Sequence, residues 1–436
     1  MHVSQSGVTE RLAMVRSLAS RLLVLVLAAG CGVSGGVHPA SDGPTVAMSG
    51  PITLATGPDF TGYMHPMVDK WNASHPTEKV TLLQLPDAAD DQHAQMVTNL
   101  QAKSDRYDVL NMDIVSTAEF ADAGWIIPLD RRQFPLDQFL KPVVDTAKFG
   151  GRLYGVPYTS NAGLLYYRKD ILDKAGKKPP KTWAELRQLA RNVAPKYGLE
   201  GYAGQFLPYE GLTVNFAEAV QSAGGAILTD DGTKVAVNTP QARQGLDFLV
   251  RGFREGWIPK RSLTFKEEES RKEFQDGKLL FLRNWPYVYG LMSRAGSKVR
   301  DKFGVTLLPG QDGPGSSSLG GANLAVSAYS RHQKTAIAFI KYFTQLDNER
   351  EVLTRGSSPP VWARLYDDPV LIKRFPYLPV LKQSILSARP RPVSPNYNQV
   401  SLAISNAVSG AISFRQSPDA AISQMAGDLG SVITNR

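Results

Sequence analysis

Residues 80–112 read VTLLQLPDAADDQHAQMVTNLQAKSDRYDVLNM, in which two short apolar segments flank a longer polar one. The apolar segments, 80–85 and 107–112, are rich in Val and Leu, as buried strands are. The segment between them, 88–103, is predicted to be a helix. A strand, a helix and a second strand in this order indicate a βαβ unit of a mostly parallel sheet.

The same alternation of strands and helices extends along the rest of the chain. Further strands are predicted at 52–55 and 164–167, and further helices around 67–71 and at 182–193, 211–222, 239–255, 268–276 and 336–343. Thr182 and Glu185 have the spacing of a capping box, which marks the start of a helix. The restart of the alternation after residue 164 predicts two α/β lobes, and the length of 436 residues is sufficient for both.

The amino terminus has the pattern of a secretion signal. Three arginines within residues 11–21 precede nine small and apolar residues, 22–30. This run is too short to cross a bilayer, because a span needs about 20 residues. Cys31, the only cysteine, follows Ala-Ala-Gly directly. The junction resembles the lipobox of bacterial lipoproteins, although Leu27 lies one residue further from the cysteine than in the commonest form, and it implies cleavage before Cys31 and lipidation of Cys31.

This leader predicts where the protein is found. Residues 1–30 are expected to be a signal peptide and residues 31–50, which are small and polar, a flexible tether. The folded body is then held at the outer face of the cell membrane, or lies in the periplasm. The alternative for Cys31 is a buried apolar thiol. A single cysteine allows no intrachain disulfide, so the body depends on its hydrophobic core.

The charge of the chain argues against a nucleic-acid partner. The formal net charge is +9, and residues 1–30 contribute +2 from three Arg and one Glu, which leaves +7 on the exported part. The excess is spread along the chain, without the basic stripe interleaved with aromatic residues that nucleic-acid binders use. A solvated basic surface, or weak attraction to an anionic cell envelope, accounts for it.

Six short phrases between residues 151 and 326 point to one family. They are GRLYGVP at 151–157, LLYYRKD at 164–170, PKTWAEL at 180–186, FQDGK at 274–278, NWP at 284–286 and GGANLAV at 320–326. In this order and behind a lipobox, they resemble the extracellular sugar-binding proteins of ABC importers, family 1 of the maltose/trehalose type. The segment DIVSTAEFADAGW at 113–125 makes the mycobacterial-type trehalose-binding lipoproteins the most similar branch.

The resemblance implies an architecture for residues 50–436. It is the maltose-binding-protein-like, type II periplasmic-binding-protein fold, with two α/β lobes joined by hinge crossings and a ligand cleft between them. The expected first lobe is 50–157 and 306–350, and the expected second lobe is 158–305 and 351–436. A sugar would lie in the cleft and be buried by lobe closure.

The resemblance also implies a set of sugar-contacting residues. They are Asp59, Asp113, Asn161, Glu267, Trp285, Gly321 and Arg391. Carboxylates accept hydrogen bonds from paired hydroxyls, an amide both donates and accepts, and a guanidinium donates a planar fork. Trp285 would stack on the apolar face of a sugar ring, and Gly321 would let the backbone approach the ligand.

Each of these residues also has a structural interpretation that the sequence leaves open. Asp113 could cap the following helix, Asn161 and Gly321 could hold turns, and Trp285 could belong to the core. A neighbouring glutamate could replace Glu267. Arg391 could form a surface ion pair, and Arg389 competes with it for the role of sugar donor. Glu210 has no assigned role. The tryptophans at 71, 125 and 183 are predicted to belong to the core.

Two functions of other classes compete with sugar import. A secreted glycoside hydrolase would also combine carboxylates with aromatic rings, and a sensor or adhesion lipoprotein could use the same fold. The sequence has no Gly-x-Ser-x-Gly elbow, no phosphate-binding loop and no helical pair of zinc-binding histidines. We therefore predict a monomeric binding protein without catalytic residues, metal or cofactor. It would deliver a disaccharide, trehalose before maltose, to a membrane permease driven by a cytoplasmic ATPase.

Overall fold

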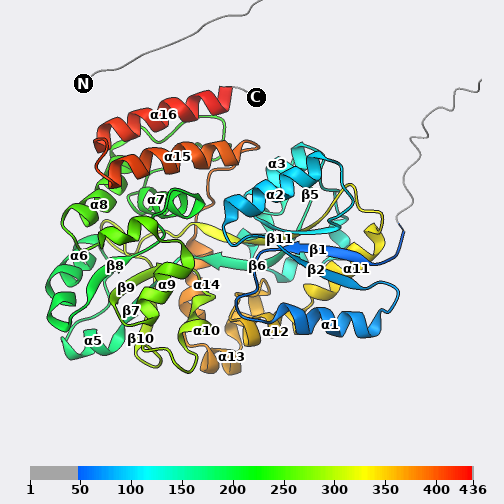
Figure 1. The fold of residues 1–436 in the computed structure, drawn as a ribbon, viewed down its shortest axis with the longest axis horizontal. Coiled ribbons are helices and arrows are strands. Elements are labelled where there is room, and N and C mark those ends of the chain that lie inside the picture. The colour runs from blue at the N-terminus through cyan, green and yellow to red at the C-terminus, as the bar shows by residue number, and fades with distance from the viewer. Residues whose placement is uncertain (1–47, 435–436) are drawn as a thin grey trace, which may run out of the picture. The chain divides into compact units, whose positions relative to one another are not determined.

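The computed structural model describes residues 48–434, and its first sheet joins strands that are distant in sequence (Figure 1). The order of the five strands is β2-β1-β3-β11-β6. Their bounds are β1 Ile52–Thr56, β2 Val80–Gln84, β3 Val109–Asp113, β6 Val156–Ala162 and β11 Leu319–Val326. β1 is parallel to β2 and β3, whereas β11 is antiparallel to β3 and β6. The predicted βαβ unit is confirmed, since β2 and β3 both run parallel to β1. The expected mostly parallel sheet is wrong, because β11 enters it antiparallel to both of its neighbours.

The second sheet has four strands in the order β10-β7-β9-β8. Their bounds are β7 Leu164–Arg168, β8 Glu200–Ala203, β9 Leu279–Asn284 and β10 Phe303–Thr306. β8 and β9 are parallel, and β7 is antiparallel to both β9 and β10. A short hairpin of β4 Lys148–Phe149 and β5 Arg152–Leu153 stands apart from both sheets.

Helices surround each sheet. Those of the first lobe are α1 Met64–Ser74, α2 Ala89–Gln101, α3 Ser116–Asp122, α4 Lys141–Asp145, α11 Gln333–Phe343, α12 Leu346–Gly356, α13 Pro369–Arg374 and α14 Leu378–Ser387. Those of the second lobe are α5 Lys169–Lys174, α6 Trp183–Asn192, α7 Glu210–Ser222, α8 Pro240–Arg254, α9 Glu267–Gln275, α10 Val288–Met292, α15 Tyr397–Ile412 and α16 Pro418–Thr434. Short 3-10 turns lie at η1 Arg131–Gln133, η2 Leu136–Gln138, η3 Ala194–Tyr197, η4 Lys260–Thr264 and η5 Ala363–Asp367. The predicted helices are confirmed, and α6 begins with the expected capping box of Thr182 and Glu185.

The chain crosses between the lobes at positions that differ from the expected ones. The expected boundary after Pro157 falls inside β6, which stays in the first sheet to Ala162 because it pairs with β11. The helices between 351 and 387 also lie with the first lobe, since α14 packs against β6 and α12 against α11. We propose 48–162 and 319–387 as the first lobe, and 164–306 and 397–434 as the second. The segments 307–318 and 388–396 then join them.

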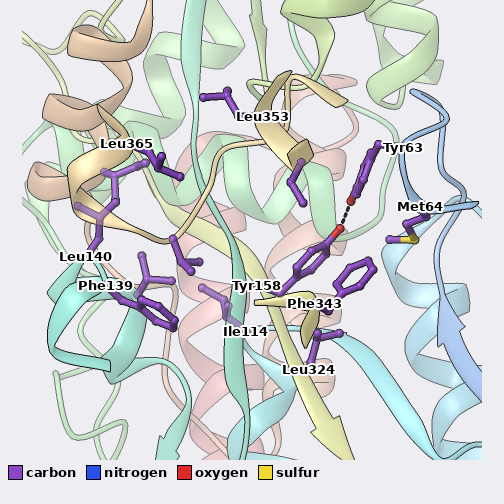
Figure 2. Packing of buried hydrophobic residues seen from close by; sticks show 14 of the residues in the cluster. Tyr63, Met64, Ile114, Phe139, Leu140, Tyr158, Leu324, Phe343, Leu353 and Leu365 are labelled. Carbon is purple, nitrogen blue, oxygen red and sulfur yellow. Dashed lines mark hydrogen bonds between the residues drawn. The ribbon is translucent and has the colours of Figure 1, made fainter. Parts of the chain in front are cut away.

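A large apolar cluster lies between the first sheet and the helices around it and continues into the second lobe, where it includes Phe274, Leu282 and Val288. Figure 2 shows side chains from several segments converging there, with the hydroxyls of Tyr63 and Tyr158 hydrogen-bonded to each other. A separate cluster fills the second lobe between its sheet and α7, α8, α15 and α16. Trp71 is 3% exposed, as predicted for a core residue. Trp125 and Trp183 are only half-buried, because each packs at the edge of a cluster, on Phe120 and Phe248 respectively.

Glu349 is a buried acid within this core, and it predicts a pH-dependent stability. One carboxyl oxygen accepts the Val361 N–H at 2.8 Å and the other has no partner among residues 48–434. Burial raises the pKa of Glu349 well above its ordinary 4.5. The folded protein therefore holds a proton that the unfolded chain releases above pH 4.5, so the stability that this group contributes at low pH is lost as the pH rises.

We expect Glu349→Gln to raise the melting temperature at pH 7, because the amide needs no proton to remain buried. The gain should shrink as the pH falls toward 4, where the wild-type carboxyl is protonated in both states. Glu351→Gln on the same helix is the matched control, since Glu351 is partly exposed and pairs with Lys70 at 3.5 Å. Thermal unfolding across this pH range measures the difference. An equal effect of both substitutions would contradict the interpretation.

The expected signal peptide, Cys31 and most of the expected tether lie outside the described residues. Within residues 48–434, no helix combines the length and the apolar composition that a bilayer crossing needs.

Candidate functional site

A cleft of about 310 Å³ lies between the two lobes. Six of the seven residues expected to contact a sugar line this cleft, namely Asp59, Asp113, Asn161, Glu267, Trp285 and Gly321. They come from the loop after β1, from strands β3, β6 and β11, from the start of α9 and from the turn after β9. The seventh, Arg391, does not line the cleft but binds Asp113. The structure therefore brings the expected residues together, and their contacts with a ligand stay predictions.

Two adjacent glycines of β11 form part of the cleft wall. Gly321 has φ +124°, a conformation that disfavours residues with a Cβ, and a Cβ there would collide with the Thr159 carbonyl. A Cβ on Gly320 would lie 2.9 Å from the ring of Trp285. Glycine is therefore needed at position 321 for the close approach of β11 to β6, and at position 320 to leave room for the Trp285 ring. The open alternative of a simple turn is wrong for Gly321, because it lies inside a strand.

Asn161 faces the cleft from β6, opposite Gly320 in the strand register. Its side-chain amide makes no hydrogen bond with any residue that the structure describes. Both its donor and its acceptor are therefore available to a ligand. The alternative of a turn residue does not apply, since Asn161 belongs to a regular strand.

Asp113 ends β3 and is held by Arg391 from the segment between α14 and α15. Both terminal nitrogens of Arg391 donate to the Asp113 carboxylate, and Nη1 also donates to Glu210 at 2.6 Å. Glu210 in turn accepts from the hydroxyls of Tyr397 at 2.7 Å and Ser401 at 2.5 Å. The guanidinium is 2% exposed, and such burial is tolerated because carboxylates surround it.

The electrostatics of this cluster explain why Arg391 lies behind Asp113 rather than on the cleft. Burial alone would lower the pKa of Arg391, but the charges of Asp113 and Glu210, together with Tyr397, keep that pKa above its ordinary value. Burial raises the pKa of Glu210, and Arg391 opposes that rise. In this structure Arg391 orients the Asp113 carboxylate, a third of which remains exposed. Glu210, which the sequence left unassigned, stabilises Arg391.

The three consecutive glutamates at the start of α9 all line the cleft but have different partners. Glu267 accepts from the Tyr209 hydroxyl at 2.7 Å, and burial raises the pKa of Glu267. Glu268 accepts from Arg271, at 2.8 Å for Nη2. Glu269 accepts the Lys266 N–H at 3.1 Å. Glu267 also interacts with the side chain of Trp285, so this carboxylate lies beside the aromatic residue of the cleft.

Trp285 presents its indole ring to the cleft from the turn after β9. The guanidinium of Arg283 lies 4.2 Å from the ring centroid and covers one face, so a ligand can use only the other. Arg283 is 1% exposed and is held by Glu218 at 2.7 and 2.6 Å. This buried ion pair therefore fixes the orientation of the cleft aromatic.

Asp59 shapes one edge of the cleft through its own loop. Its carboxylate accepts from the Thr61 N–H at 3.1 Å, the Thr61 hydroxyl at 3.1 Å, the Gly62 N–H at 2.7 Å and the Met64 N–H at 2.7 Å. These four bonds use most of the acceptor capacity of a carboxylate. Asp59 therefore mainly holds the loop 57–63 and the start of α1, and has little capacity left for a ligand.

The sequence interpretation missed several residues that line the cleft, of which Asn111 and Tyr287 are the most informative. Asn111 precedes Asp113 by two positions in β3, so both point to the same side of the sheet. Its Nδ2 donates to Thr56 at 2.9 Å, and its Oδ1 is buried with no partner among the described residues. Strand alternation from Asp113 could have identified it.

A ligand-sized cleft between two α/β lobes is a preferred place for small-molecule binding. Residues 57–349 match the family model described as bacterial extracellular solute-binding protein, and the chain belongs to that family. Members of the family bind solutes and do not transform them, so the chain is a binding protein and not an enzyme. The alternative of a glycoside hydrolase is thereby removed.

Individual relatives are similar over most of the chain. A probable ABC transporter-binding protein of Deinococcus radiodurans is 34% identical over 382 residues, which cover 84% of this chain and 89% of the relative. The solved structure of maltose-bound T. maritima MalE3 is 32% identical, has a TM-score of 0.84, and is matched over 87% of this chain and 99% of its own. A mannitol-binding protein of Pseudomonas aeruginosa is 25% identical over 57% of this chain and 59% of its own. The maltose-binding-protein-like fold with two lobes is thus established.

Proposed function

We propose that this protein is the sugar-binding component of an ABC importer, which captures a disaccharide in the cleft and delivers it to a membrane permease. The observation that carries the proposal is the cleft lining, in which the free amide of Asn161, the open face of Trp285 and the exposed part of Asp113 meet. Trehalose is the favoured ligand, on the resemblance of 113–125, and maltose or another α-glucoside is next. The D. radiodurans and T. maritima relatives support the importer and the maltose assignments, respectively.

The charge of the cleft favours a neutral ligand. Its lining residues include six carboxylates, Asp59, Asp87, Asp113, Glu267, Glu268 and Glu269, and one lysine, Lys266. An anionic solute would meet an excess of like charge, although the chain as a whole is basic. Sugar hydroxyls, by contrast, donate to carboxylates, and each such bond contributes about 1.5–3 kcal/mol. A few of them reach micromolar affinity, which corresponds to about −8 kcal/mol.

The volume of the cleft favours a short ligand. A volume of about 310 Å³ lies at the lower end of the range for small-molecule pockets, which is roughly 300–1,000 Å³. A mono- or disaccharide suits this volume better than a long oligosaccharide. Because one relative is a mannitol-binding protein, a linear sugar alcohol should also be tested as a ligand.

A ligand panel tests the proposed function. Thermal unfolding of the protein is measured with trehalose, maltose, mannitol and maltotriose, and with glucose 1-phosphate as the anionic control. A sugar at 100 times its Kd should stabilise the fold by about 2.7 kcal/mol, which appears as a higher melting temperature. Glucose 1-phosphate should cause no shift. A shift with the phosphate and none with the neutral sugars would overturn the proposal.

We also infer that lipid on Cys31 anchors the exported protein to the membrane, as the leader sequence predicts. Cys31→Ser in the full chain should move the protein from the membrane fraction to the soluble extracellular or periplasmic fraction, because no lipid can be attached to serine in this way. Ser34→Ala, in the expected tether, is the control and should stay with the membrane. Membrane retention of the Cys31 variant would contradict lipidation.

A further inference from the structure

Two aromatic side chains meet across the cleft, one from each lobe. Phe60 lies in the loop 57–63 of the first lobe and Tyr287 at the start of α10 in the second. Their ring centroids are 6.2 Å apart with an interplanar angle of 23°, and both residues line the cleft. We propose that Phe60 and Tyr287 form an aromatic gate, which slows the release of a bound sugar and limits the length of sugar that the closed cleft accepts. This inference rests on the proposed function.

Phe60 is exposed but its position is fixed. The side chain is 42% exposed, and its one ring contact among the described residues is with Tyr287. The loop around it is held by the four hydrogen bonds to Asp59. An apolar ring presented to solvent on a rigid loop gains burial only when the opposite lobe covers it. Its position therefore serves the closed state of the cleft.

Tyr287 is the fixed half of the pair on the second lobe. Its hydroxyl donates to Glu268 at 2.8 Å, and Arg271 holds that carboxylate in turn, at 2.8 Å for Nη2. The ring also packs against the main hydrophobic core. Closure of the lobes brings Phe60 onto a ring that is already oriented, so little side-chain conformational entropy is lost when the gate forms.

The other contacts across this rim are polar and exposed. Arg294 donates to the Thr61 carbonyl at 3.1 Å, and Lys266 lies 3.7 Å from Asp87. Exposed pairs of this kind contribute little to stability. The aromatic pair is thus an apolar contact at the rim of the cleft, whereas the lobes also meet outside the cleft lining, where Tyr289 packs on Tyr377 with ring centroids 4.2 Å apart. A sugar too long for the cleft would have to hold the rim pair apart.

Stopped-flow kinetics with maltose, trehalose and maltotriose test the gate. Phe60→Ala should raise the dissociation rate of the bound disaccharides about 2- to 12-fold, the factor that one aromatic pair is worth. It should also improve the affinity for maltotriose relative to maltose. Tyr287→Ala, which removes the other ring of the pair, should resemble Phe60→Ala. Phe414→Ala is the control, since Phe414 is 52% exposed and does not line the cleft.

The outcomes separate this proposal from the proposed function. If the wild type binds none of the three sugars, the proposed function fails and the gate fails with it. If the wild type binds sugar but Phe60→Ala leaves rates and length preference unchanged, only the gate is overturned. A uniform loss of affinity for all sugars would make Phe60 a stacking platform and would also overturn the gate. Thermal unfolding without sugar checks that each variant is folded.

Discussion

Trp285→Ala is expected to weaken sugar binding roughly 30- to 700-fold. The indole supplies the flat apolar surface of the cleft, and Arg283 already covers its other face at 4.2 Å, so no other side chain can take its place from behind. Truncation of a central aromatic residue in a binding site costs about 2–4 kcal/mol, and each 1.4 kcal/mol is a factor of about ten in affinity. Isothermal titration with trehalose and maltose measures the loss.

Trp183→Ala is the matched control for this substitution. Trp183 is a half-buried tryptophan of the same lobe, it stacks on Phe248 at 4.6 Å, and it does not line the cleft. Its removal should lower the melting temperature and leave the sugar affinity unchanged. If both tryptophan variants lose affinity equally, then the effect of Trp285→Ala reflects the stability of the lobe rather than a contact with the ligand.

Arg283→Met is expected to lower the free energy of unfolding by about 3–5 kcal/mol, because it leaves the Glu218 carboxylate buried without its cation. The arginine is 1% exposed and Glu218 is 5% exposed, so water cannot solvate the remaining charge. The substitution should also weaken the connection between the lobes at Ser317 and Gly163. Glu218 accepts from the Ser317 hydroxyl at 3.2 Å, and Ser317 accepts the N–H of Gly163 at 2.5 Å, between β6 and β7.

The double variant Glu218→Gln with Arg283→Met tests the physical reason for this loss. Replacing both charges removes the uncompensated carboxylate, so most of the stability should return. Urea unfolding of the two single variants and the double variant gives the coupling between the residues. A loss below about 1 kcal/mol in Arg283→Met would mean that the pair behaves as a solvated surface pair.

The structure also shows which substitution is unsuitable as a test of ligand contact. Asp113→Ala would remove a sugar acceptor and, at the same time, leave Arg391 with Glu210 as its only carboxylate partner. Loss of binding in that variant could come from either cause. Asn161→Ala is cleaner, because the Asn161 side chain forms no hydrogen bond within residues 48–434.

Local patterns carried most of the fold prediction. The strand–helix–strand order of 80–112 led to the parallel pairing of β1, β2 and β3, since apolar periodicity and short connections limit the possible topologies. The capping box at Thr182 was also predictable from the sequence, because it depends on residues three positions apart. The lobe boundaries were not, because the end of β6 is set by its pairing with β11, more than 150 residues away.

The prediction of the cleft also has a part that local sequence supplied and a part that it could not supply. The sequence by itself determined the family resemblance, and with it the identity of most cleft residues, since short phrases such as NWP at 284–286 carry these side chains in a fixed local setting. Only the tertiary structure decided the partners of each charge. It places Arg391 between Asp113 and Glu210, it uses Asp59 to hold a loop, and it brings Phe60 onto Tyr287. These pairings join segments up to 278 residues apart, and their energies depend on burial and distance, which local sequence does not encode.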